Sequence, residues 1–237
     1  MNMMCTFACT AALGLASVGS LSAEALAPGY SAPAPSHLDS VLEQLDRASA
    51  SFKSAEADVH KDLYEALVKQ HTLQQGSIYF ERKAGATQMG AKIVGEGAVT
   101  VEYRNGTLRR YQPGLKCFEV YSTGNKSSIE SFLTLGFGGS GKDLSKSWVI
   151  SDQGTEKLND GKQTIDVEKL DLVARDQGVR NNFTHVTLWV DAARGISLKQ
   201  VFYTPSGDTQ TATYTNVRLN QSVNKKPFEI SGNACSK

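Results

Sequence analysis

The stretch VEYRNGTLRRYQPGLKCFEVYS, residues 101–122, decides the fold class. It holds two tight-turn signals, Asn105-Gly106 and Pro113-Gly114, and the runs around them alternate apolar or aromatic residues with polar ones. An Asn-Gly pair flanked by alternating runs is a strong signal for a β-hairpin, and a Pro-Gly pair marks a second turn. The stretch therefore predicts three short strands of a broad antiparallel sheet.

The same two-residue period continues along most of the chain after Gly76, and glycine-containing turn signals separate most of the runs. The segment 58–68 fits a helix or a strand, because Val59, Leu63 and Leu67 share both a helical face and a strand parity. The predicted strands are residues 76–83, 91–95, 98–104, 107–112, 116–122, 146–152, 163–173, 182–190, 196–204 and 209–219, with a short piece near Phe228.

Two helices are predicted beside these strands. Ser36 is a good N-cap, and the apolar residues from Leu38 to Phe52 then follow the 3, 4, 7 spacing of one helical face. The second helix opens at Ser127 with a Ser-x-x-Glu capping box and ends near Leu135 in a run of glycines. This central helix fits a cover that can move, and it fits equally a plain connecting helix docked on the sheet.

These elements predict an α+β fold. A twisted sheet of about ten strands tends to curl, and helices over its open side enclose an apolar space. We therefore expect a large curved antiparallel sheet that forms an unclosed β-barrel. The N-terminal and central helices would act as a lid over an apolar cavity.

The N-terminal residues have the pattern of a secretory signal peptide. They carry no charge before Glu24, and their apolar run from Phe7 to Val18 is too short to span a bilayer comfortably. Small-residue cleavage patterns end at Ala23 and Ala25. The alternative is a frayed N-terminal tail. We expect residues 1–23 to be the signal peptide, residues 24–36 to be a Pro- and Ala-rich linker, and residues 37–237 to be one domain.

Cysteine usage agrees with export. Cleavage would remove Cys5 and Cys9 and leave Cys117 and Cys235. Two cysteines in an exported protein can form one disulfide, which here would tie a strand of the sheet to the C-terminal tail. The sequence is compatible with this disulfide and also with two free thiols.

No pattern in the sequence predicts catalysis. The four histidines are isolated, and neither a His-Glu-x-x-His nor a Cys-x-x-Cys pattern occurs. The stretch GFGGSGKD, residues 136–143, nearly matches a phosphate-binding loop, but Asp143 replaces the Ser or Thr that binds magnesium and the loop follows a predicted helix. We expect no enzyme activity, no cofactor and no metal site. The formal net charge of +1 gives no general attraction to nucleic acid.

The order of elements resembles the LolA-like family of periplasmic outer-membrane lipoprotein carriers, over roughly residues 37–231. An amphipathic helix comes first, and QGSIYFERK at residues 75–83 resembles the family's glycine-led strand that ends in Lys-Arg-Pro. The hairpin at residues 103–121 resembles the family's hairpin and the strand after it. Residues 186–220, with PFEI at residues 227–230, resemble its C-terminal meander and closing strand. Two positions depart from the family pattern, since Lys83 replaces a proline and Asn105 replaces an aspartate.

The resemblance implies a function and a set of partners. It implies a periplasmic carrier that holds the acyl chains of triacylated lipoproteins, or of related lipids, and shuttles them from the inner to the outer membrane. It also implies a lipoprotein-releasing ABC transporter in the inner membrane and a receptor in the outer membrane as partners, and we expect a monomer. The family has an arginine that ties the sheet to the lid when the cavity is empty, and Arg82 matches its position.

Strand parity then predicts the residues that line the cavity. Ile78, Phe80 and Arg82 share one face of a strand, so a cavity that contains the first two also contains the third. Without the resemblance, Arg82 would be an exposed cation at the end of a strand. On the strand 182–190, Trp189 points away from the cavity. The expected cavity residues are Ile78, Phe80, Val99, Val101, Tyr103, Phe118, Val120, Ile129, Phe132, Leu133, Val186, Leu188 and Val190.

Two other classes of function fit the same pattern. A periplasmic lipid-sensing or protein-interaction module could use the same fold without transfer activity, because one fold serves several functions. An enzyme acting on a lipid or an envelope polymer would need a converged nucleophile–base pair. Binding of an apolar fluorescent probe that a lipopeptide displaces would favour the carrier.

Overall fold

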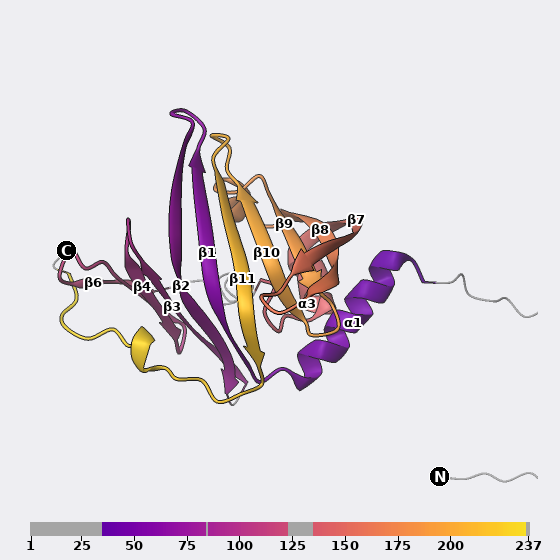
Figure 1. Ribbon diagram of the computed structural model, residues 1–237, viewed down its shortest axis with the longest axis horizontal. Coiled ribbons are helices and arrows are strands. Elements are labelled where there is room, and N and C mark those ends of the chain that lie inside the picture. Colours follow the sequence, from indigo (N-terminus) through magenta and orange to yellow (C-terminus); the bar gives the residue numbers. More distant parts are fainter. Residues whose placement is uncertain (1–34, 84, 123–134, 236–237) are drawn as a thin grey trace, which may run out of the picture. The chain divides into compact units, whose positions relative to one another are not determined.

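One large antiparallel sheet forms the framework of the protein (Figure 1). The computed structural model describes residues 35–83, 85–122 and 135–235. The elements in chain order are α1 (His37–Ser51), β1 (Ser54–Glu65), β2 (Gln70–Lys83), β3 (Ala86–Val94), β4 (Val99–Arg104), β5 (Thr107–Tyr111), β6 (Phe118–Ser122), α3 (Gly141–Ser147), β7 (Trp148–Asn159), β8 (Thr164–Ala174), α4 (Gln177–Arg180), β9 (His185–Asp191), β10 (Ile196–Tyr203), β11 (Thr209–Leu219) and the 3₁₀ helix η1 (Lys226–Phe228).

The sheet is not closed into a barrel. Its 11 strands follow the order β6-β5-β4-β3-β2-β1-β11-β10-β9-β8-β7, so β6 and β7 are its two edges. Every strand neighbours a strand that precedes or follows it in the chain, and the additional pairing of β1 with β11 joins the two halves. This topology confirms the predicted α+β fold with an unclosed antiparallel sheet.

The ten strands predicted within residues 76–219 are all observed, with shifted ends. The ambiguous segment 58–68 begins as strand β1, because its alternating side chains pair with β2 on one side and β11 on the other. The predicted strand near Phe228 is wrong, since residues Lys226–Phe228 form the 3₁₀ helix η1 there. Helix α3 was not predicted. It begins where the glycine run ends, with Ser140 as its N-cap.

The predicted central helix lies mostly outside the described residues, and so do residues 1–34. The N-terminal helix is confirmed. Ser36 caps α1, and Asp39 completes a capping box by accepting from the Ser36 backbone while its own backbone N–H donates to the Ser36 hydroxyl.

The two faces of the sheet are covered differently. We call the inner face the one on which α1 packs, where Val41 and Leu45 of the helix join Leu170 and Leu188 of the sheet in one buried cluster. The other face is the outer face, and Trp189 lies on it, as strand parity predicts. The Trp189 indole N–H donates to Glu156 at 2.7 Å. Figure 1 shows α1 beside the β7–β9 part of the sheet and η1 near β3 and β4.

The C-terminal tail covers part of the β6 edge. Ala234 forms a parallel bridge with Phe118, and the backbone N–H of Cys235 donates to the Phe118 carbonyl at 2.9 Å. A disulfide joins Cys117 to Cys235, 118 residues apart in sequence. The bond closes a loop that includes more than half of the sheet, so it restricts the unfolded chain strongly.

We predict that the double variant Cys117→Ser/Cys235→Ser folds but loses about 2–5 kcal/mol of unfolding free energy, the usual effect of removing a native disulfide. Urea unfolding followed by tryptophan fluorescence measures the difference. A reductant should lower the midpoint of the wild-type protein toward that of the variant and leave the variant unchanged. A wild-type midpoint that does not respond to complete reduction would contradict the prediction.

The start of α1 is held to the opposite edge by His37. Its Nδ1 lies 2.6 Å from Asp152 Oδ2 and its Nε2 lies 3.4 Å from Glu168 Oε2. The hydrogen bond with Asp152, followed by the charges of both carboxylates, raises the pKa of His37 above its usual 6.5. Because the folded-state pKa is raised, the attachment is fully present below pH 6.5 and is lost as the pH rises through the folded pKa.

We therefore expect NMR titration to place the pKa of His37 above 6.5 and to show that Asp152→Asn lowers it. A pKa for His37 that does not change in the Asp152→Asn variant would contradict the assignment.

Candidate functional site

An apolar cavity of about 280 Å³ lies on the inner face of the sheet. Six strands contribute to its wall, from β4 through β3, β2, β1 and β11 to β10, so its floor is the middle of the sheet. The described residues that line it are Val59, Lys61, Ile78, Phe80, Met89, Ala91, Ile93, Val99, Val101, Leu135, Phe183, Gln200, Phe202, Gln210, Ala212 and Tyr214.

Phe137 packs against two of the residues that line this hollow. It comes from the segment before α3 and is 2% exposed. Its ring stacks on Phe80 with a centroid separation of 4.3 Å and meets Tyr214 edge-on at 4.9 Å. Since Phe80 and Tyr214 both line the cavity, Phe137 occupies apolar space that would otherwise be continuous with it.

The segment Leu135–Gly138 is attached to the sheet by backbone carbonyls. Gln200 is buried at the cavity wall and donates from Nε2 to the Leu135 carbonyl at 2.7 Å. The backbone N–H of Ser197 donates to the Gly136 carbonyl at 2.6 Å. The Gly138 carbonyl accepts from the Ser49 hydroxyl of α1 at 2.7 Å. The segment is therefore held by a few discrete hydrogen bonds and by one aromatic side chain.

Gly138 fits this position for a steric reason. Its φ is +70°, and a Cβ added to it would lie 2.4 Å from the Phe52 ring. A larger residue would need both a rare backbone conformation and a displaced ring. The glycine-rich sequence thus lets the segment pass close under the end of α1.

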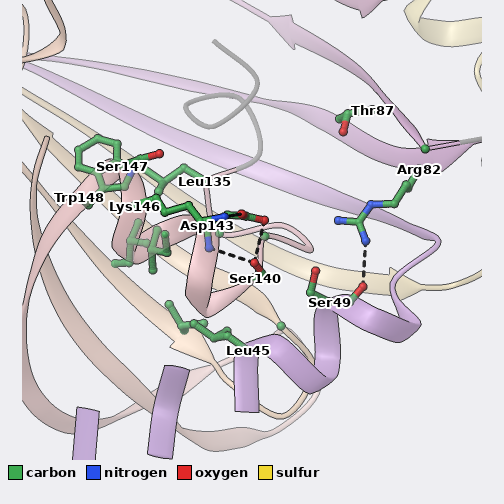
Figure 2. Close-up of a pocket in the computed structure, with 17 residues that line it drawn as sticks. Leu45, Ser49, Arg82, Thr87, Leu135, Ser140, Asp143, Lys146, Ser147 and Trp148 are labelled. Atoms are coloured by element: carbon green, nitrogen blue, oxygen red, sulfur yellow. Dashed lines mark hydrogen bonds and ion pairs between the residues drawn. The ribbon is translucent and has the colours of Figure 1, made fainter. Parts of the chain in front are cut away.

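Arg82 joins three parts of the chain at the end of β2. Its Nη1 donates to the Ser49 carbonyl of α1 at 2.9 Å, and its Nη2 donates to the Gly138 carbonyl at 2.7 Å. The guanidinium also lies over the Phe52 ring, 5.6 Å from its centroid. Figure 2 shows Arg82 extending from its strand toward Ser49. Both hydrogen bonds end on backbone carbonyls, so displacement of the segment would remove the Gly138 acceptor, and displacement of α1 would remove the Ser49 acceptor.

A second, more polar cavity of about 610 Å³ lies beside Arg82, between α1, α3 and the inner face (Figure 2). Leu135 lines both cavities. Within the second cavity, the hydroxyl of Ser140 donates to Asp143 at 2.8 Å, and this hydrogen bond lowers the pKa of Asp143. In the apolar cavity, burial raises the pKa of the Tyr214 phenol.

The structure places four of the predicted residues in the apolar cavity, namely Ile78, Phe80, Val99 and Val101. Tyr103 is fully buried in the adjoining core. Val186, Leu188 and Val190 lie on the inner face in the cluster beneath α1, and Leu188 and Val190 also line the second cavity. Ile129, Phe132 and Leu133 lie outside the described residues.

Phe118 and Val120 require a correction. Val120 pairs with Arg109, and Arg109 pairs with Glu102, which points to the outer face beside the inward-facing Val101 and Tyr103. Phe118 and Val120 therefore lie on the outer face and do not line the cavity. The predicted strand alternated correctly, but the Pro-Gly turn sets a register one residue away from the expected one, and a one-residue slip exchanges the two faces.

Several cavity residues were not predicted from the sequence. Phe137 lies in a glycine-rich stretch that shows neither the helical nor the strand period. The only sequence signal for it is that it is a single large apolar residue among glycines. The inner-face residues of the last two strands could have been found by parity, since Gln200 and Phe202 alternate with Val201 and Tyr214 alternates with Thr213. Lys61 and Met89 line the cavity from strands whose inner face was not assigned.

Within residues 35–83, 85–122 and 135–235, no group of three His, Cys, Asp or Glu side chains is placed to hold a metal ion. None of the helices in this part of the chain combines the length and the apolar character needed to cross a bilayer.

No family model and no curated protein matches the chain. Among solved structures it is similar to MucB, at 12% identity and a TM-score of 0.49 over 81% of this chain and 62% of that one. It is also similar to a putative outer membrane lipoprotein-sorting protein domain from Vibrio parahaemolyticus, at 15% identity and a TM-score of 0.42 over 81% and 97%. A LolA superfamily protein from Nitrosomonas europaea shows 15% identity and a TM-score of 0.39 over 81% and 96%. The chain spans about 62% of the length of MucB. At these identities the similarity concerns the fold alone.

Removing the ring of Phe137 should both destabilise the protein and enlarge the hollow. We predict that Phe137→Ala loses about 3–5 kcal/mol of unfolding free energy, the usual cost of truncating a buried phenylalanine. An apolar fluorescent probe should bind the variant more tightly than the wild type and recover part of the lost stability. Tyr121→Ala, which truncates an aromatic residue that is 44% exposed, is the matched control. Equal probe affinities in Phe137→Ala and wild type would contradict the assignment of Phe137 to the cavity end.

Proposed function

We propose that this chain is a carrier that binds lipid acyl chains in the apolar cavity, and that it delivers lipoproteins or related lipids between membranes. The observation that carries the proposal is an apolar hollow on the inner face of an unclosed sheet, with the buried Phe137 ring packed against two of the residues that line it. The resemblance of the sequence to LolA-like carriers supports the same function and suggests the periplasm as its compartment. The Cys117–Cys235 disulfide agrees with an oxidising compartment.

Transfer requires that binding be strong but not excessive. Burial of a hydrocarbon chain contributes about 0.8 kcal/mol per methylene, and a bilayer offers the same gain. A carrier therefore needs an apolar site that binds the hydrocarbon chain about as strongly as the membrane does. In the closed form Phe137 already uses part of the apolar surface of Phe80 and Tyr214, so an entering chain must replace contacts that exist. This competition lowers the net gain on loading and permits release.

The volume of the hollow defines what loading involves. About 280 Å³ is at the lower end of the range of roughly 300–1,000 Å³ that is typical of ligand pockets. One apolar chain suits this volume better than three. A triacylated cargo would need Phe137 and its segment to move, which joins the apolar cavity to the space beside Arg82 through Leu135.

Arg82 would set the balance between the closed and the loaded forms. Its hydrogen bond to the Gly138 carbonyl exists only while the segment lies beside Arg82, and its hydrogen bond to the Ser49 carbonyl exists only while the end of α1 lies there. Loading requires these hydrogen bonds to break, which opposes loading, and they form again when the cargo is released, which favours release. The proposed route runs from a lipoprotein-releasing transporter in the inner membrane to a receptor in the outer membrane, with no catalytic step by this chain.

The proposal is tested by purification from the native envelope followed by mass spectrometry of what stays bound. Acyl lipids or lipoproteins in the cavity would support it. A stable protein partner, with no bound lipid and no transfer between vesicles, would favour a sensor or interaction module and overturn the carrier.

We predict that Arg82→Leu still loads cargo but releases it about tenfold more slowly, because loss of two charge-assisted hydrogen bonds favours the open form even after solvent screening. A vesicle-to-vesicle lipid transfer assay measures both steps. Lys83→Leu is the matched control, since it is the next residue on the strand and its side chain points to the other face. Delivery by Arg82→Leu at the wild-type rate would show that the arginine has no role in release.

A further inference from the structure

Lys61 is an unusual residue for its position. It lies on the inner face of β1, two residues from the buried Val59, and its side chain lines the apolar cavity. Of the described residues that line this cavity, Lys61 alone carries a formal charge, and the others are apolar residues, two glutamines and a tyrosine. A lysine at an apolar wall normally pairs with a carboxylate or extends to water.

Within residues 35–83, 85–122 and 135–235, no carboxylate forms an ion pair with Lys61. Its cross-strand neighbours are Gln74 on β2 and Ala212 on β11. The ion pairs of this part of the chain involve other cations, and on β1 itself Asp62 pairs with His71 and Glu56 pairs with Arg218. Burial lowers the pKa of Lys61, which is the direction expected for an ammonium group that lacks a counter-ion.

The surroundings of Lys61 add hydrogen-bonding groups. Gln210 lines the same cavity from β11, where its neighbour across the ladder is Leu63, two residues from Lys61 on the same face. Gln210 is also opposite Phe202, another cavity residue. An ammonium and an amide therefore lie together at one side of a hollow that is otherwise apolar. This combination recognises an anionic oxygen group attached to a hydrocarbon chain.

We propose that Lys61 binds the anionic headgroup of a single-chain amphiphile whose hydrocarbon tail occupies the apolar cavity. The ligand class is thus a long-chain carboxylate or phosphate ester, in preference to a neutral or cationic amphiphile. This inference deepens the proposed function and depends on it, since the cavity must bind a hydrocarbon chain. The volume of about 280 Å³ agrees with one chain.

The test compares three probes that share a ten-carbon tail and differ in charge: decanoate, decan-1-ol and decyltrimethylammonium, each below its micelle concentration. Displacement of an apolar fluorescent probe from the purified chain gives each affinity. We expect decanoate to bind at least about tenfold more tightly than decan-1-ol, the effect of one charge-assisted hydrogen bond. Decyltrimethylammonium should bind more weakly than either.

Variants of Lys61 assign the preference to its charge. Lys61→Met keeps an unbranched apolar stem and should bind decanoate and decan-1-ol with affinities that agree within about twofold. Lys61→Arg should restore the preference for decanoate, and Lys61→Glu should favour the cationic probe. Lys92→Met is the matched control, because Lys92 is an exposed lysine on the outer face of the nearby strand β3. Retained binding of decan-1-ol shows that each variant is folded.

The outcomes separate the two proposals. If the wild type binds decanoate and decan-1-ol equally, or if Lys61→Met keeps the preference for decanoate, the role of Lys61 is wrong and the apolar carrier stands. If none of the three probes binds the wild type, the cavity does not accept a hydrocarbon chain, and the proposed function fails together with this inference.

Discussion

The contact of Phe137 with Phe80 and Tyr214 is the interaction on which the rest of the structure depends. A curved sheet that does not close leaves an apolar inner face, and apolar surface in water is unfavourable. Helix α1 covers this face over β7–β9, and the segment around Phe137 covers part of its middle. The remaining hollow is bordered by the same two aromatic residues that hold Phe137. Stability of the closed form and capacity for a ligand therefore depend on one set of contacts.

Two cations lie on the inner face with different partners. Arg82 donates to backbone carbonyls of α1 and of the segment before α3, so its charge is used inside the protein. Lys61 lines the hollow with no carboxylate partner among the described residues. Along β2, Arg82 lies eight residues from Gln74, the partner of Lys61, which corresponds to about 26 Å of extended strand. The two charges are thus far apart on the same face.

Much of the fold followed from sequence because period and turn chemistry agree. Asn105 adopts a positive φ of 53°, as an Asn-Gly hairpin requires, and the strands on both sides of it formed as expected. The same argument placed Ile78, Phe80, Val99 and Val101 on the inner face. It failed after the Pro-Gly turn, where register depends on loop geometry that side-chain alternation does not encode, and Phe118 and Val120 changed face.

The parts of the site that sequence did not reveal depend on tertiary contacts. Phe137 has no periodic neighbours, and its position is set by hydrogen bonds from Gln200 and Ser197 on a distant strand. Lys61 looks like an ordinary surface residue of an alternating strand until the pairing of β1 with β11 puts it inside the wall. Such residues are defined by which strands meet, and no local pattern carries that information.

The two edges of the sheet have a consequence for assembly. An exposed edge strand invites another chain to add a strand to the ladder. The C-terminal tail, tethered by Cys235, already occupies hydrogen-bonding groups of β6 at Phe118, and β7 is interrupted by a bulge between Asp152 and Thr155. Addition of a second copy is therefore hindered at the start of β6 by the disulfide-tethered tail and at β7 by the bulge.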